Sequence, residues 1–137
     1  MLMSNVQEKV SKFMAVKYGY LPGRAKQLKS FATVMFNFSQ YLGSNKYYSD
    51  LLNRRIALVS LDVDLLALRA EKLRTDAEGM YALVTVAILA KKKPELDVKS
   101  VAAFQRELDA AWIEARRVHA LLIELMGDIK KEYAQTR

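Results

Sequence analysis

The chain has 137 residues, of which 52% are hydrophobic and 27% charged, and its formal net charge is +7. These proportions fit one globular domain and exclude a disordered chain. Because cysteine is absent, disulfides, thiolate nucleophiles and cysteine-based zinc sites are excluded, and a reducing compartment is expected. The longest uncharged apolar run, residues 80–90, is shorter than the ~20 residues that span a bilayer. We therefore expect a cytoplasmic protein with no membrane partner.

Two short helices are expected in the first third of the chain, residues 1–43. Residues 5–18 carry apolar side chains at helical spacing: Val6, Val10, Phe13 and Met14. Pro22 and Gly23 predict a break after this helix. A second helix is expected over residues 24–42, with Gly43 as its cap. Its apolar side comprises Leu28, Phe31, Val34, Met35, Phe38 and Leu42.

Two heptad ladders dominate the rest of the chain. The first comprises Leu52, Ile56, Val59, Val63, Leu66, Ala70, Leu73, Ala77, Met80, Val84 and Ala87. The second comprises Val101, Phe104, Leu108, Ala111, Ala115, Val118, Leu122, Leu125 and Ile129. Sustained 3.5-residue spacing is typical of helices packed along a shared seam. We expect a long antiparallel hairpin over residues 45–136, with its turn at 91–97 and Asp97 as N-cap of the last helix.

Gly79 leaves two alternatives for the first ladder. The ladder stays in phase across it, which favours one helix of roughly 45 residues, about 65 Å long. The capping-box pattern from Thr75 to Glu78, followed by the glycine, instead predicts a turn and a compact five-helix bundle. In both cases the fold is all-α, a four- to five-helix bundle in one domain (residues 1–137) with two shorter N-terminal helices packed on one end.

A second leucine stripe lies off the first ladder: Leu51, Leu58, Leu61, Leu65 and Leu68. A helix that is apolar on two sides is expected to be sandwiched, so we expect the two N-terminal helices to cover this stripe and not to reach beyond residue 70. Further along, an apolar surplus remains that predicts an interface with a second copy of the chain. Its residues are Tyr81, Leu83, Val86 and Leu89.

Positive charge and aromatic residues concentrate in residues 1–49. This segment holds seven basic residues, the last being Lys46, against the single acid Glu8, and nine of the 13 aromatics, including Tyr47 and Tyr48. Cations displace counterions from phosphates and rings stack on bases, so the pattern favours a DNA or RNA surface. The expected site comprises Lys9, Lys12, Lys17, Tyr20, Arg24, Lys26, Lys29 and Phe36. The alternative is a solvated or partner-facing basic surface.

No catalytic or metal-binding motif is evident. His119 is the only histidine, and it lies beside the second ladder, where a packing role is expected. Without a second histidine or a cysteine, neither a nucleophile pair nor a metal site has support, and we expect no enzyme activity, cofactor or metal. The leading hypothesis is a non-enzymatic homo-oligomer that binds nucleic acid. The alternative is a phage or bacterial assembly, adaptor or inhibitor subunit that docks an acidic protein. The layout resembles that of phage small terminase subunits, without a matching motif.

Overall fold

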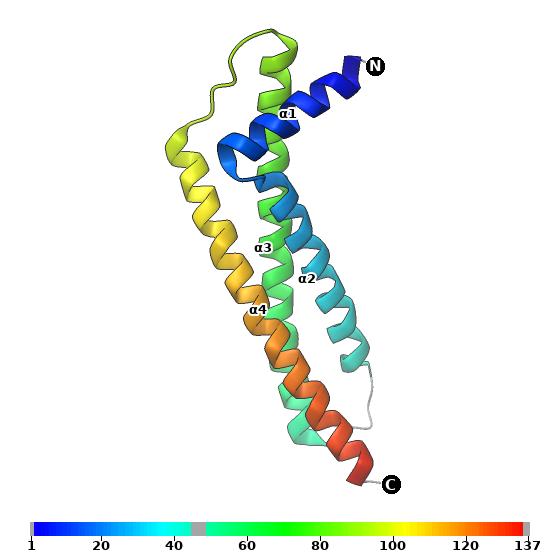
Figure 1. Ribbon diagram of the computed structural model, residues 1–137. Coiled ribbons are helices and arrows are strands. Elements are labelled where there is room, and N and C mark those ends of the chain that lie inside the picture. The colour runs from blue at the N-terminus through cyan, green and yellow to red at the C-terminus, as the bar shows by residue number, and fades with distance from the viewer. Residues whose placement is uncertain (1, 45–48, 136–137) are drawn as a thin grey trace.

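The computed structural model describes residues 2–44 and 49–135, with side chains from residue 5 onward, and all elements in these ranges are α-helices. The helices are α1 (Leu2–Tyr18), α2 (Leu21–Gly43), α3 (Asp50–Leu89) and α4 (Val98–Gln135). As Figure 1 shows, α3 and α4 form an antiparallel hairpin, α2 runs along both, and α1 crosses α3 near its C-terminal end. The predicted all-α helical bundle is confirmed. Lys46, Tyr47 and Tyr48 lie outside the described residues.

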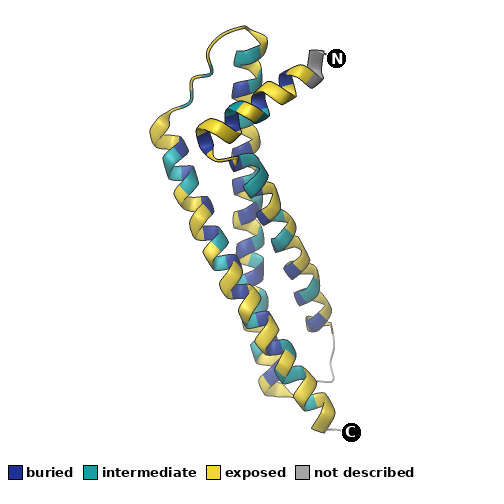
Figure 2. Ribbon diagram, in the orientation of Figure 1, coloured by how far each residue is buried: buried dark blue, intermediate teal, exposed yellow. Residues whose placement is uncertain are grey.

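The two predicted ladders form the core of the hairpin. Leu66 and Leu73 of α3 are buried, as are Leu108 and Ala115 of α4, and the buried bands of the two helices face each other in Figure 2. Two ion pairs fix the antiparallel register at the lower half of the bundle, Arg117 Nη2–Asp62 Oδ2 at 3.4 Å and Arg55 Nη1–Asp128 Oδ2 at 2.6 Å. The heptad spacing thus predicts which faces meet.

Helix α2 carries a third ladder that joins the same core. Its buried residues step by four and three: Leu21, Ala25, Leu28, Ala32, Met35, Ser39 and Leu42. Ser39 is tolerated there because its hydroxyl donates to the carbonyl oxygen of Phe36 at 2.9 Å. The prediction that Val34 belongs to this core was wrong, since it is 67% exposed. The contact face of α2 instead includes the small residues Ala25 and Ala32, which lie on the opposite side of the helix from Val34.

Helix α3 is continuous through Gly79, so the predicted alternative of a turn was wrong. A Cβ placed on Gly79 would meet nothing within 4 Å. The helix ends at Leu89 with Ala90 as its C-cap, and Lys91 after the cap adopts a left-handed φ of 57°. The Lys92 N–H donates to Ala87 O at 2.8 Å and the Lys91 N–H to Ile88 O at 3.0 Å, which is a Schellman cap. Asp97 then caps α4 as predicted, accepting from the Lys99 N–H at 3.2 Å.

The connection between α1 and α2 is tighter than expected. Gly19 and Tyr20 both have left-handed φ values, 64° and 62°, and α2 already begins at Leu21. Pro22 and Gly23 therefore lie in the first turn of α2, where a missing N–H costs nothing, and the predicted start at residue 24 was too late. At the other end, Gly43 is the last helical residue and right-handed Ser44 follows it as the C-cap, so the predicted glycine cap is not formed.

The N-terminal helices reach the second half of α3, contrary to our expectation that they stop near residue 70. Lys29 Nζ lies 3.1 Å from Glu71 Oε2, and Met14 shares a cleft with Ala77 of α3. The reason is direction: α2 runs antiparallel to α3, so its first turn, where α1 joins, lies at the level of the seventies of α3. Helix α1 consequently packs across the upper end of the bundle (Figure 1).

Candidate interaction surfaces

The largest apolar surface feature is a row of leucines on α3, which we call the leucine face. Its members are Leu51, Leu58, Leu61, Leu65 and Leu68, each between 60% and 71% exposed. They recur at the a and d spacing of a heptad, and Arg54 occupies the one position of the row that is not leucine. Single exposed leucines are ordinary on a protein surface, but a contiguous row of them is a candidate interaction site.

The expectation that the N-terminal helices cover the leucine face was wrong. Helix α2 instead packs in the groove between α3 and α4, where its own ladder meets the inner ladders of both. The ion pair between Lys29 and Glu71 holds α2 on a different side of α3 from Leu65 and Leu68.

Charged groups border the leucine face. On the side toward α4, Asp62 and Arg55 are occupied by ion pairs with that helix. Arg54 and Asp64 make no ion pair within the described residues, and Asp64 Oδ1 is buried without a hydrogen-bond partner there. The face therefore has an unpaired cation and an unpaired anion beside its leucines.

Beyond residue 70 the outer side of α3 continues into an open groove. The groove has a volume of about 630 Å³ and lies between α3, the 95–97 segment and the start of α4; its lining includes the acidic residues Asp76, Glu95, Asp97 and Glu107. Among the residues predicted for an oligomer interface, Leu83 and Val86 are 60% and 64% exposed, and Leu89 is 50% exposed. Tyr81 is separate from them, because it is partly buried against the core.

The basic residues of α1 and α2 do not form one uninterrupted positive surface. Three of the six cations predicted for nucleic-acid binding contact carboxylates: Lys12 with Glu8 at 3.5 Å, Arg24 with Asp109 at 2.8 Å, and Lys29 with Glu71 at 3.1 Å. The Arg24 pair joins α2 to α4 and the Lys29 pair joins α2 to α3. These two side chains thus act first as links between helices.

The other predicted residues are exposed. Lys9, Lys17 and Lys26 are exposed and have no ion pair within the described part of the chain. Tyr20 is also exposed, at the α1–α2 connection. Phe36 lies some four turns further along α2 than the helix start, so the structure does not bring it together with Tyr20. Tyr18, which borders Tyr20 in sequence, is buried in the core.

Tyr20 and Lys26 meet in a cleft between α1, α2 and α3. The cleft has a volume of about 440 Å³, and the ring of Tyr81 and the side chain of Arg74 also line it. A Cβ on Gly23 would lie 2.5 Å from Tyr20 Cδ1, so glycine at this position lets the Tyr20 ring lie flat against the first turn of α2. Sequence reasoning missed this cleft because its residues come from three helices.

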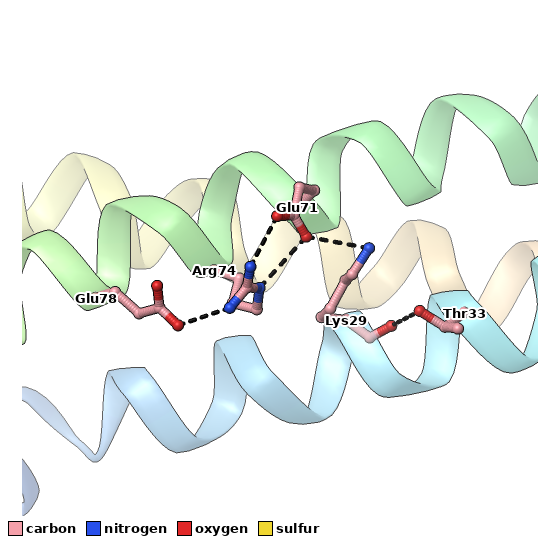
Figure 3. A network of polar contacts seen from close by, with 5 residues as sticks. All are labelled: Lys29, Thr33, Glu71, Arg74 and Glu78. Atoms are coloured by element: carbon pink, nitrogen blue, oxygen red, sulfur yellow. Dashed lines mark hydrogen bonds and ion pairs between the residues drawn. The ribbon is translucent and has the colours of Figure 1, made fainter.

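Figure 3 shows a polar network between α2 and α3. Two of its residues, Arg74 and Glu78, also line this cleft. Glu71 Oε1 lies 2.8 Å from Arg74 Nη2, and Arg74 Nη1 lies 2.6 Å from Glu78 Oε1. The hydrogen bonds from Arg74, and then that from Lys29, lower the pKa of Glu71 to about 2. The positive charge of Arg74 is thereby balanced by two carboxylates, which leaves Lys26 as the cation available to a ligand in the cleft.

Within the described residues, no three histidine, aspartate or glutamate side chains gather closely enough to hold a metal ion. The ring of His119 is exposed and stands 5.3 Å from that of Phe31, which in turn stacks on Trp112 at 6.1 Å. His119 therefore has the packing contact expected from its place beside the ladder. None of the described helices has an apolar stretch that would let it span a bilayer.

No protein-family model, curated protein or solved structure matches the chain. The geometry of the leucine face, the cleft and the basic residues is therefore the basis on which a function is proposed.

Proposed function

We propose that the chain is a non-enzymatic assembly subunit that associates with other copies of itself through the leucine face of α3. The observation that carries this proposal is the row of five leucines, 60–71% exposed, at heptad spacing on a continuous helix. Heptad-spaced leucines are the contact surface of paired helices. Burying them stabilises the pair by about 25 cal/mol for each Å² of apolar area removed from water. The inner core uses none of these five side chains.

Sedimentation velocity at micromolar concentration tests this proposal. The wild-type protein is expected to sediment as a dimer or larger species, and Leu58→Glu combined with Leu65→Glu to sediment as a monomer, because two buried charges oppose pairing. The matched control is Val34→Glu, an equally exposed apolar residue on α2, which should leave association unchanged. Circular dichroism confirms that each variant keeps its helices. A monomeric wild-type protein, or a control variant that dissociates equally, overturns the proposal.

A second candidate is nucleic-acid binding at the α1–α2 end, through the cleft. The observation that favours it is the meeting of the exposed Lys26 with Tyr20 and Tyr81, because a cation beside aromatic rings suits the phosphates and bases of a single strand. The ion pairs of Lys12, Arg24 and Lys29 reduce the charge available for this purpose. This candidate is therefore ranked below self-association.

Binding to a fluorescent single-stranded oligonucleotide at about 50 mM salt tests the second candidate. Lys26→Gln should weaken binding, whereas the matched Lys29→Gln, which removes a charge already balanced by Glu71, should have a smaller effect. Tyr20→Ala should cost ~1–3 kcal/mol for each stacked base. Absence of binding, or equal effects of the two lysine variants, contradicts the candidate.

A further inference from the structure

We infer that two copies of the chain pair antiparallel along the leucine face, with Leu51 of each copy level with Leu68 of the other. This inference rests on the proposed self-association and adds the direction and register of the contact. Antiparallel pairing about a two-fold axis makes the same surface serve both copies, which is the commonest way in which identical chains assemble.

The spacing of the leucines permits this register. Antiparallel helices pair a positions with d positions, and in the row from 51 to 68 the a and d residues alternate. When Leu51 is level with Leu68 of the other copy, Leu58 is level with Leu61. All five leucines then lie in the seam, which extends about 25 Å along each helix.

The positions of the charged residues on α3 favour this register over the alternatives. The remaining seam position is Arg54, which comes level with Leu65 of the other copy. Asp64 precedes Leu65, so the Arg54 guanidinium of one copy lies beside the Asp64 carboxylate of the other, and neither has an ion pair within the described part of its own chain. The two-fold axis makes this contact twice in each dimer. An antiparallel shift by one heptad in one direction would instead place Arg54 level with Lys72. In the other direction it would place Arg54 level with Leu58 and leave Leu65 and Leu68 without a helical partner, because α3 begins at Asp50. Parallel pairing would place Arg54 against Arg54. Like charges opposed in a seam oppose association.

The paired segment ends near residues 50 and 69 of each copy, because α3 begins at Asp50. Leu83 and Val86, although exposed, lie beyond the overlap in this arrangement. The leucine face is therefore distinct from the apolar residues further along α3. Leu83→Glu should leave the dimer intact, whereas Leu61→Glu should dissociate it.

Thiol cross-linking tests the direction, and the chain has no cysteine of its own to interfere. Two full-length variants, Leu51→Cys and Leu68→Cys, each change one exposed residue. In the inferred dimer, residue 51 of one copy lies about 25 Å along the seam from residue 51 of the other, beyond the ~7 Å between Cα atoms that a disulfide bridges. Each variant oxidised alone should give little covalent dimer, and an equimolar mixture left to exchange should give a covalent heterodimer.

The outcomes distinguish the inference from the proposed function. Covalent dimer in each variant alone but no gain in the mixture means parallel pairing; this overturns the inference and leaves self-association in place. Dimers in sedimentation that cross-link in neither experiment also overturn it, since another register or surface must then hold the copies. A monomeric wild-type protein overturns both.

Discussion

The inner and outer faces of α3 have nearly the same chemistry and opposite environments. The inner face, represented by Val63, Leu66 and Leu73, is at most 2% exposed, whereas Leu65 and Leu68, one and two residues from Leu66, are 66% and 71% exposed. Both rows follow heptad spacing. The difference arises because α2 and α4 converge on one side of α3, so that one row is enclosed by two helices and the other by none within the described chain.

Heptad spacing therefore predicts that a face of a helix packs against another helix, but it does not specify which helix. Helix α2 had two apolar rows of α3 available to it, and its narrow ladder of alanines fits the groove that already contains α4. Packing three ladders into one core excludes more water than placing α2 on the opposite side of α3 would. The leucine face is the consequence, a heptad-spaced row of leucines that stays exposed in the monomer and for which we propose a partner in a second copy.

The largest expected effect is on the inner face. Leu73→Ala leaves a cavity in a core with little room to relax, and should lower the free energy of unfolding by about 2–5 kcal/mol. The matched variant Leu68→Ala removes the same atoms from an exposed position and, measured on dilute monomer, should change it by about 0.5 kcal/mol or less. Urea denaturation provides both values. Equal losses of unfolding free energy at the two positions would contradict the difference between the inner and outer faces of α3.

A smaller effect in the stabilising direction is expected at Gly79 on the outer side of α3. Gly79 has helical neighbours and open space around its Cα, so Gly79→Ala should raise the free energy of unfolding by about 0.5–1 kcal/mol through lower backbone entropy in the unfolded chain. Gly23→Ala is the contrasting variant, because its Cβ would overlap the Tyr20 ring, and it should destabilise. Thermal or urea unfolding measures both; a destabilising alanine at Gly79 would indicate that α3 is interrupted there.

The smallest effect concerns the flank of α3 that faces α2. The folded-state pKa of Glu71, about 2, lies below its ordinary value of 4.5, so its contribution to stability is complete above about pH 4.5 and is lost as the pH falls toward 2. The stability difference between wild type and Glu71→Gln should therefore shrink across this range. Glu124→Gln, an exposed residue without an ion pair in the described part, is the control. A difference that does not vary with pH would mean that the Lys29–Glu71–Arg74 network is not formed in solution.

Much of the fold could be predicted from the sequence, because leucine, isoleucine and valine at heptad spacing define the two long helices and the face along which they meet. The ladder of α2 was missed because Ala25, Ala32 and Ser39 give little hydrophobic signal, although its steps of four and three are present from Leu21 onward. For α2, the large apolar residues therefore predict a helix but not its contact face.

The candidate surfaces could be predicted only in part. The basic residues of the N-terminal third are visible in the composition, but the partners of Arg24 and Lys29, which are Asp109 and Glu71, lie 85 and 42 positions away along the chain. The cleft at Tyr20 likewise combines three helices. Such pairings depend on the tertiary arrangement, as does the choice of which leucine row is covered.

The most direct test of the central claim, that the leucine face pairs copies of the chain, is the concentration dependence of thermal unfolding. If folding and pairing are linked, the Tm of the wild-type protein should rise steadily over about a hundredfold increase in protein concentration, because mass action favours the associated folded state. The Tm of the Leu58→Glu, Leu65→Glu variant should stay constant over the same range. A wild-type Tm that is equally independent of concentration would contradict the claim.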